Sequence, residues 1–147
     1  MYRRIVVPVD GSAGSETAVP HALGLARAFQ AEVIVCHVVT AAEGTKKADV
    51  PDGAAEYASR IAERFLTGGV AAKTDVRRGD PAFQIRKSAA AWGADAVVMA
   101  TRSRRRVEKL VLGSVADEVV RDSRLPMLLV SARNRTKRAN APERGAA

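Results

Sequence analysis

The chain has 147 residues, of which 47% are hydrophobic, and its formal net charge is +8. This length fits a single domain that buries about two thirds of its unfolded surface. The single cysteine, Cys36, excludes an intramolecular disulfide and a multi-cysteine metal site, and its apolar neighbours predict a small buried side chain. No window approaches the ~18 consecutive apolar residues of a membrane span, and residues 1–4 lead straight into a predicted strand. We therefore expect a cytoplasmic protein without a membrane segment.

The positive charge lies in two short segments. Residues 102–109 carry five basic residues against one glutamate, and so do residues 133–147, so each segment contributes +4 and the rest of the chain sums to zero. Local basic segments favour local contacts with anions over a whole face that follows nucleic acid. The first segment also lacks aromatic residues on which bases could stack. Nucleic acid is therefore not an expected partner.

The chain opens with a predicted strand, turn and helix. Residues 4–9 are a β-branched run that predicts a buried strand, and the sequence Asp10-Gly11-Ser12 after it predicts a turn into a helix. Residues 15–29 have apolar positions at helical spacing. Pro20 is tolerated only in the first helical turn, so this helix begins near residues 15–17 or bends at Pro20. The apolar positions of the predicted helix are Ala18, Ala22, Leu25, Ala26 and Phe29.

Two further strands and a helix are predicted in the middle of the chain. Residues 32–39 read as a second buried strand, and residues 40–53 are polar, without a period, and predict a loop. A helix is predicted over residues 54–66, before the stop signal Gly68-Gly69, and a strand over residues 71–78. The apolar stripe of this helix contains Ala55, Ala58, Ile61, Ala62 and Phe65.

The last third of the chain predicts two more helices and two more strands. Gly79-Asp80-Pro81 supplies a turn, a helix N-cap and a proline at the first helical position, and this helix ends at Trp92, before Gly93. Residues 95–100 and 125–130 are short apolar runs that suit buried parallel strands. A helix begins at Gly113-Ser114, where backbone N–H groups and the nearby arginines predict an anion site.

Strands that alternate with helices predict an α/β fold. The expected architecture is a three-layer, doubly wound, five-stranded parallel sheet with right-handed crossovers and helices on both faces. Ligands bind such sheets beyond the carboxyl ends of the strands, where the strand order reverses. This rule points to the ends of the first and fourth strands, at Asp10 and at residues 99–102. We expect the domain to span residues 1–131 and residues 132–147 to form a basic, disordered tail.

Three motifs together resemble the universal stress protein family over about residues 1–131. They are Val7-Pro8-Val9-Asp10-Gly11-Ser12 after the first strand, His37-Val38 at the end of the second, and Gly113-Ser114-Val115-Ala116 before the last helix. The resemblance implies a flavodoxin-like sheet with strand order 3-2-1-4-5, a homodimer and, in one branch of the family, bound ATP, with which Mg²⁺ would be associated. It also implies that Asp10 accepts a hydrogen bond from the adenine or ribose side of the nucleotide, and that Val9 and Val38 contact the base.

The nucleotide-binding branch carries a glycine motif that this chain matches in spacing and only partly in residues. Ala100 and Ser103 stand where that branch has its first two glycines, while the final pair, Gly113-Ser114, is present. Glycines let the backbone approach ribose and phosphate and allow positive φ. Ala100 adds one methyl group, and Ser103 costs about 1 kcal/mol if its φ must be positive, although its hydroxyl can donate to a phosphate.

The resemblance and the motif define one set of candidate nucleotide-binding residues. They are Pro8, Val9, Asp10, Val38, Met99, Ala100, Arg102, Ser103, Gly113, Ser114 and Val115.

Each part of this set also has a purely structural interpretation. Asp10-Gly11-Ser12 is also an ordinary strand-to-helix turn in which Asp or Ser caps backbone N–H groups. Residues 114–117 fit a capping box that would by itself account for Ser114. Asp117 and Glu118 would oppose an anion at this helix start. The arginine run, residues 102–106, fits a solvated loop, a phosphate clamp or a nucleic-acid contact.

No catalytic set emerges from the sequence. There is no Walker A lysine motif, no nucleophile elbow and no histidine–carboxylate arrangement suited to catalysis, so a slow ATPase is the most we expect. His21 and His37 are too isolated for a metal site, and Trp92 fits core packing at a helix end. The leading hypothesis is a stress-response regulatory protein that binds an adenine nucleotide, ATP or a related one.

The second hypothesis is a family member that binds no nucleotide and acts as a dimeric interaction or scaffold protein. In both cases we expect a homodimer through the last strand, Met127 to Ser131, because a doubly wound sheet leaves an edge strand that needs cover and this one is apolar.

Overall fold

The structure is a computed structural model that describes residues 1–40, 52–101 and 113–132. The predicted loop over residues 41–51, the segment 102–112 and the tail from residue 133 lie outside these residues. The strands are β1 (Arg4–Val9), β2 (Glu32–Val39), β3 (Ala72–Arg78), β4 (Ala96–Thr101) and β5 (Met127–Ser131), and the helices are α1 (Ala13–Glu16), α2 (Ala18–Phe29), α3 (Asp52–Thr67), α4 (Pro81–Trp92) and α5 (Ser114–Asp122).

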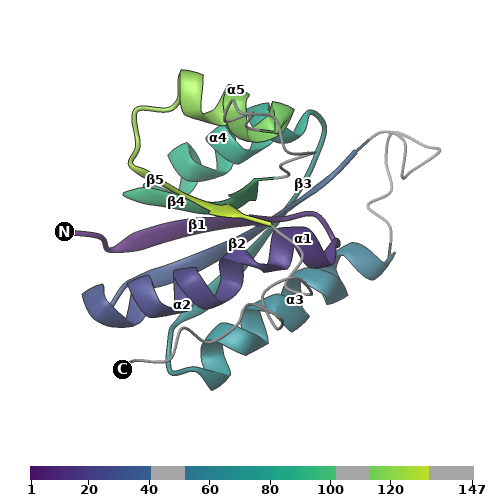
Figure 1. Ribbon diagram of the computed structural model, residues 1–147. Coiled ribbons are helices and arrows are strands. Elements are labelled where there is room, and N and C mark those ends of the chain that lie inside the picture. Colours follow the sequence, from purple (N-terminus) through teal and green to yellow (C-terminus); the bar gives the residue numbers. More distant parts are fainter. Residues whose placement is uncertain (41–51, 102–112, 133–147) are drawn as a thin grey trace, which may run out of the picture.

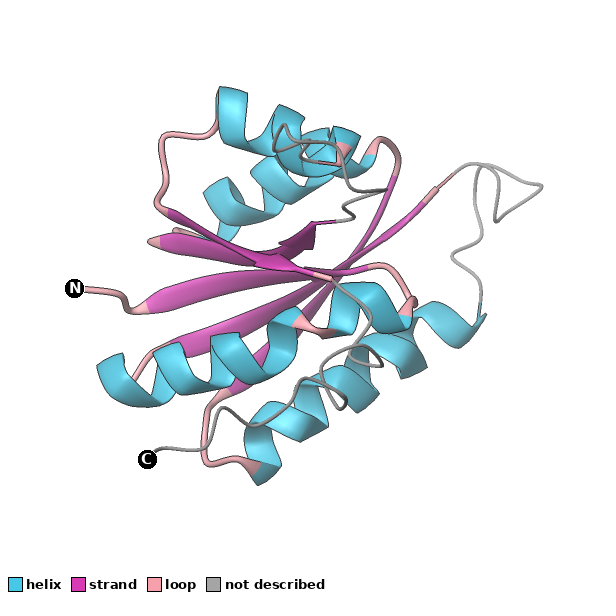
Figure 2. Cartoon of the chain, in the orientation of Figure 1, coloured by secondary structure: helices cyan, strands magenta, loops and turns pink. Residues whose placement is uncertain are grey.

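The predicted doubly wound sheet is confirmed. All strand pairs are parallel, in the order β3-β2-β1-β4-β5. Helices α1, α2 and α3 cover one face of the sheet, and α4 and α5 cover the other (Figures 1 and 2). The strand order reverses at β1, which lies between β2 and β4 and is the first strand in the chain. The ends of β1 and β4 are therefore the place where a ligand crevice is expected.

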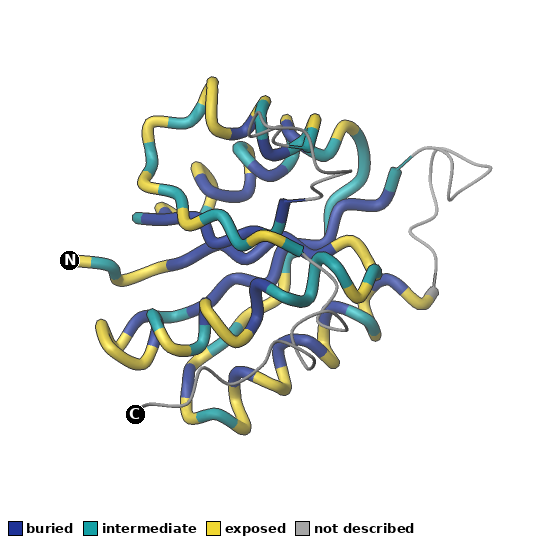
Figure 3. Tube along the Cα trace, in the orientation of Figure 1, coloured by how far each residue is buried: buried dark blue, intermediate teal, exposed yellow. Residues whose placement is uncertain are grey.

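Alternating side chains of the strands build two core layers. One layer packs the sheet against α2 and α3 around Ile5, Val35 and Phe65, and the other packs it against α4 and α5 around Ile34 and Val97. Figure 3 shows the buried residues concentrated in the strands and on the inward sides of the helices. Because both faces are covered, the central strands are continuous apolar runs, the pattern from which they were predicted.

The predicted first helix is two helices that meet at Thr17. Pro20 has no N–H to donate to the carbonyl of Glu16, so the regular helix α2 begins at Ala18 and Pro20 lies in its first turn. Thr17 closes the short helix α1, because its N–H and its hydroxyl both bond to the carbonyl oxygen of Gly14. The structure therefore follows the first alternative for Pro20, in which a regular helix starts shortly before the proline.

Two residues that were placed on apolar helix faces are exposed. Phe29 is 42% exposed and packs edge-on against Tyr2 at the end of α2. Ala55 is exposed, and Ala54 and Ala58 are the buried alanines of α3 in this region. The helical stripe predicted for α3 is correct except at its first position, where it was displaced by one residue.

A partly buried acid, Asp75, which the sequence analysis did not single out, ties β3 to α4. Asp75 Oδ2 accepts hydrogen bonds from Arg77 Nε at 2.8 Å, from Ser88 Oγ at 2.7 Å and from Trp92 Nε1 at 3.0 Å. Burial would raise the pKa of Asp75, but these hydrogen bonds, with the charge of Arg77, outweigh it and lower that pKa. Trp92 therefore packs against the core, as predicted, and is also held by a hydrogen bond.

Replacing Asp75 with alanine is expected to lower the free energy of unfolding by about 2–4 kcal/mol, because the donors of Ser88 and Trp92 lose their acceptor. Urea denaturation measures this loss. The matched control is Asp122→Ala, which removes an exposed ion pair with Arg86 at 3.0 Å and should cost no more than about 1 kcal/mol. Equal losses in the two variants would contradict the structural role of Asp75.

The same contribution should depend on pH with a definite sign. Since the pKa of Asp75 is lowered on folding, its stabilisation is complete above the unfolded pKa of about 4 and is lost as the pH falls through the folded value. The difference between the wild type and Asp75→Ala should therefore be constant near neutral pH and shrink in acid.

Candidate functional site

The strands β1 and β4 separate at their carboxyl ends. The pairing of β1 with β2 runs to Val9 opposite His37, but its pairing with β4 runs only to Val6 opposite Val97. The N–H of Glu32 bonds to the carbonyl of Arg3, so odd residues of β1 direct their backbone groups toward β2 and even residues toward β4. Pro8 is therefore the next donor position that faces β4, and it has no N–H.

The turn after β1 is closed by its own side chains. Asp10 Oδ1 accepts a hydrogen bond from the N–H of Ser12 at 2.9 Å and one from the hydroxyl of Ser12. Ser12 Oγ caps α1 by accepting from the N–H of Ser15 at 3.1 Å, and the N–H of Asp10 donates to Ser15 Oγ at 3.1 Å. Gly11 has φ +88°, which disfavours any side chain there. The structural interpretation of this turn is correct, and Asp10 remains exposed at its outer side.

The apolar candidate residues divide between the two core layers. Val9 and Ala100 belong to the layer beneath α2 and α3, whereas Val38, Met99 and Val115 belong to the layer beneath α4 and α5. The side chains of Val9 and Val38 therefore lie on opposite faces of the sheet. The methyl group of Ala100, which replaces a motif glycine, packs against the first layer.

Pro8, Val9, Val38 and Met99 are buried, so the candidate residues that solvent reaches most easily are polar. Asp10 and Ser114 are exposed, and Gly113 is partly exposed. Arg102 and Ser103 lie outside the described residues. The structure thus brings Asp10, at the end of β1, to the same edge of the sheet as Gly113 and Ser114, at the start of α5.

The start of α5 differs from the capping box that its sequence suggested. Gly113 is the N-cap and Ser114 is the first helical residue, and Gly113 has no side chain that could cap the helix start. The carboxylate of Asp117 forms an ion pair with Arg121 Nε at 3.0 Å instead of turning back to the cap. Among the described residues no side chain caps the first-turn N–H groups of α5, and the ion pair balances part of the negative charge that would oppose an anion.

Sequence reasoning missed Tyr57 and its contact with His37 beneath the turn. His37 Nδ1 donates to the carbonyl of Val9 at 2.9 Å, since a carbonyl oxygen only accepts, and the His37 ring contacts the ring of Tyr57 at a centroid distance of 4.9 Å. Tyr57 lies on α3, three residues after Ala54 and four before Ile61. That spacing places it on the buried stripe of α3 and could have identified it.

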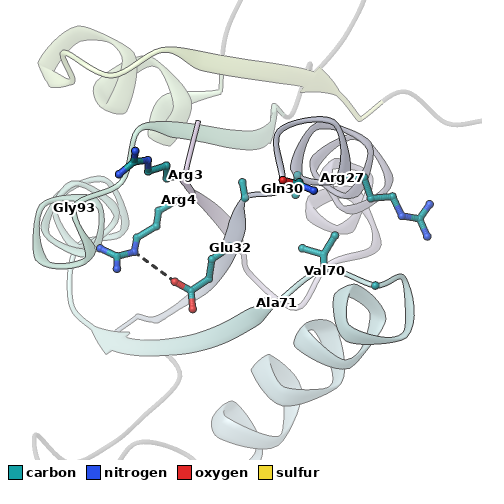
Figure 4. Close-up of a pocket in the computed structure, with 11 residues that line it drawn as sticks. Arg3, Arg4, Arg27, Gln30, Glu32, Val70, Ala71 and Gly93 are labelled. Carbon is teal, nitrogen blue, oxygen red and sulfur yellow. Dashed lines mark hydrogen bonds and ion pairs between the residues drawn. The ribbon is translucent and has the colours of Figure 1, made fainter. Parts of the chain in front are cut away.

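A groove of about 730 Å³ lies at the opposite, amino-terminal edge of the sheet. Its arginines support helix ends: Arg4 Nη1 donates to the carbonyl of Trp92 at 3.0 Å, and Arg27 Nε donates to that of Gly68 at 2.8 Å. Figure 4 shows Arg4 and Arg27 on opposite sides of the groove, with Glu32 bonded to Arg4. These cations neutralise the carboxyl ends of α4 and α3 and do not converge on one point.

The reactive side chains of the described residues form no metal or thiol centre. Cys36 is fully buried, and burial raises its pKa to about 11, with a hydrogen bond between Cys36 and Ser88 acting against the rise. Within residues 1–40, 52–101 and 113–132, no group of three or more His, Cys, Asp and Glu side chains is placed to hold a metal ion. In the same ranges, no helix has the length and apolar character to cross a membrane.

Known proteins match both the sequence and the fold. The chain is 33% identical over 140 residues to the universal stress protein MJ0531 of Methanocaldococcus jannaschii, covering 88% of this chain and 82% of the relative. The solved structure of MJ0577 from the same organism superposes with a TM-score of 0.75 at 27% identity, covering 91% of this chain and 99% of that one. A universal stress protein solved in complex with cAMP has a TM-score of 0.69 at 23% identity, covering 90% and 98%, a likeness that shows the fold alone.

The model of the universal stress protein family matches residues 1–131, which include every strand and helix of the sheet. This chain therefore belongs to the universal stress protein family.

Proposed function

We propose that this stress-response protein binds an adenine nucleotide, ATP or a related one, in the crevice at the carboxyl ends of β1 and β4. The observation that carries the proposal is the start of α5, where the N-cap is a glycine without a side chain, at the same edge of the sheet as the acidic turn after β1. Free N–H groups at a helix start favour the phosphates, and a carboxylate favours a ribose hydroxyl or an adenine amino group.

The division of roles follows from charge. Gly113, Ser114 and Val115 would present backbone N–H groups to a phosphate, with Arg102 and Ser103 supplying further donors. Asp10 would accept from the nucleoside end, while Met99 and Val38, which share one core layer, would support the base. A bound Mg²⁺ would be held mainly by phosphate oxygens, as is usual for this ion.

Two lines of support bear on the replaced motif glycines and on the ligand. The methyl group of Ala100 packs against the core, so its cost in the crevice is smaller than its position in the motif suggests. A solved universal stress protein with the same fold holds cAMP. At 23% identity this relative identifies a class of ligand to test.

Asp10→Asn is expected to weaken nucleotide binding at least tenfold. Asparagine keeps the side-chain oxygen that accepts from the Ser12 N–H and removes the charge, and a hydrogen bond to a charged group is worth about 1.5–3 kcal/mol. Calorimetric titrations with ATP, AMP and cAMP measure the change, and mass spectrometry identifies any nucleotide released from the purified protein.

The matched control for this variant is Asp95→Asn at the other edge of the sheet. Asp95 likewise accepts two hydrogen bonds, in its case from the backbone N–H groups of Arg3 and Arg4, and it lies at the amino-terminal edge of the sheet, away from the proposed site. Its replacement should leave the affinity unchanged. A wild-type protein that carries no nucleotide and gives no heat at millimolar ligand would exclude the proposed binding.

We further propose a homodimer through β5. The two edge strands differ in charge, because β3 carries Lys73, Asp75 and Arg77, whereas β5 is uncharged and its Leu128 is 42% exposed. Charged side chains on an edge strand disfavour its pairing with another chain, whereas an apolar edge strand favours such pairing. The second hypothesis, a scaffold protein without nucleotide, needs the same interface.

Leu128→Lys is expected to convert the dimer into a monomer at micromolar concentration, as measured by light scattering, because it places a charge in the apolar edge. Thr74→Lys is the control, since Thr74 is exposed on the other edge strand, and this variant should remain dimeric. A monomeric wild-type protein, or a dimer that survives Leu128→Lys, would rule out this interface.

A further inference from the structure

Tyr57 has a hydroxyl group that is sealed from solvent and makes no hydrogen bond, the one buried side-chain polar atom of this kind among the described residues. Such a group forfeits its bonds to water without replacement, which is rare in folded proteins. The burial of the Tyr57 hydroxyl without a partner therefore needs a structural or functional explanation. Tyr57 stands beneath the turn that contains Asp10, the acidic half of the proposed nucleotide site.

The ring of Tyr57 is held from two sides. The ring of His37 contacts it edge-on at 4.9 Å and is itself fixed by the 2.9 Å bond to the carbonyl of Val9, the last residue of β1. The guanidinium of Arg60 lies 5.7 Å from the ring centroid. A hydroxyl on a ring fixed in this way cannot easily move to find a partner, so the partner has to come to it.

Two possible partners lie in the turn above. Burial raises the pKa of Tyr57, and the charges of Glu16 and Asp10 add to the rise, while the Ser15 hydroxyl and the Gly11 N–H act against it as hydrogen-bonding groups that approach the phenol. Neither group, however, reaches the distance and angle of a formed hydrogen bond with the Tyr57 hydroxyl. A small movement of the turn would give the hydroxyl both bonds at once, as acceptor from Gly11 and as donor to Ser15.

The bonds within the turn hold it away from Tyr57. Ser15 Oγ donates to the carbonyl of Ser12 at 2.9 Å and accepts from the N–H of Asp10, which leaves one lone pair of Ser15 unused. Asp10 Oδ1 in turn holds the N–H and the hydroxyl of Ser12. A ligand that donates to Asp10 competes for this carboxylate and so weakens the bonds that hold the turn.

We propose that Tyr57 is a positioning residue of the nucleotide site, onto which the turn of residues 10–15 closes when a nucleotide occupies Asp10. This inference rests on the proposed nucleotide binding. The bound state gains two hydrogen bonds that the free state lacks, and a ligand shifts a protein toward the state in which such differential contacts are made. The unsatisfied hydroxyl of the free protein thereby adds to the affinity for nucleotide.

The test is Tyr57→Phe, which removes the hydroxyl and keeps the ring. We expect the variant to bind ATP or AMP roughly 5-fold to 30-fold more weakly in calorimetry, the equivalent of one or two net hydrogen bonds. Without nucleotide, it should melt at the wild-type temperature or up to about 4 °C above it, because an unsatisfied buried polar atom is gone. A merely structural tyrosine would show the opposite pattern, with lower stability and unchanged affinity.

The matched control is Tyr2→Phe. Tyr2 is the other tyrosine of the chain and also packs edge-on against a ring, that of Phe29, but at the far edge of the sheet. It should change the affinity by less than about twofold. Wild-type affinity in Tyr57→Phe would overturn the role of Tyr57 and leave nucleotide binding intact. A clear fall in the melting temperature of ligand-free Tyr57→Phe would show that the hydroxyl is bonded in the free protein, and a wild type without nucleotide affinity would overturn both proposals.

Discussion

The missing N–H of Pro8 is the constraint on which the arrangement of the site depends. Every other even residue of β1 can bond to β4, and the ladder stops where Pro8 would have to donate. The β2 side of β1 is unaffected and stays paired to Val9. One imino acid thus lets β1 hold its place in the centre of the sheet while its last residues part from β4. The topological switch point, which many sheets share, is opened here by a local covalent feature.

The two sides of the proposed nucleotide site have complementary chemistry. On one side the turn after β1 presents a carboxylate whose position is set by bonds to Ser12. On the other side α5 begins at a glycine N-cap, which brings no side chain to the first backbone donors, and the bridge from Asp117 to Arg121 reduces the opposing negative charge. An acceptor at one end and donors at the other suit a ligand with a polar nucleoside end and an anionic end.

The strands and their order followed from apolar runs and alternation because both faces of a parallel sheet are buried. The N-cap of α4 was also predicted from the sequence, because Asp80 and Pro81 are specific local signals. The structure confirms it, since Asp80 accepts a hydrogen bond from the N–H of Phe83. Local sequence signals gave a wrong prediction where tertiary structure decided between two possible helix starts. The segment 114–117 fits a capping box, yet the helix begins one residue earlier with Gly113 as its cap.

The polar contacts of the interior were not predictable from the sequence in the same way. In the sequence Asp75 is one of several charged residues within residues 71–78, and its role appears only when Ser88 and Trp92, thirteen and seventeen residues later, donate hydrogen bonds to it. The environment of Tyr57 likewise cannot be predicted from its own segment, because its neighbours are His37 and the turn at Asp10. Spacing along a helix shows which side chains turn inward, but the partner of a buried polar atom depends on how distant elements pack.

The burial of Cys36 bears on how a universal stress protein of this kind can sense its environment. Peroxides and disulfides react with the thiolate form of an accessible cysteine. Cys36 is the only cysteine of the chain, its side chain is fully buried, and its pKa of about 11 keeps the thiol protonated in the cell. The folded protein therefore has no redox-active thiol.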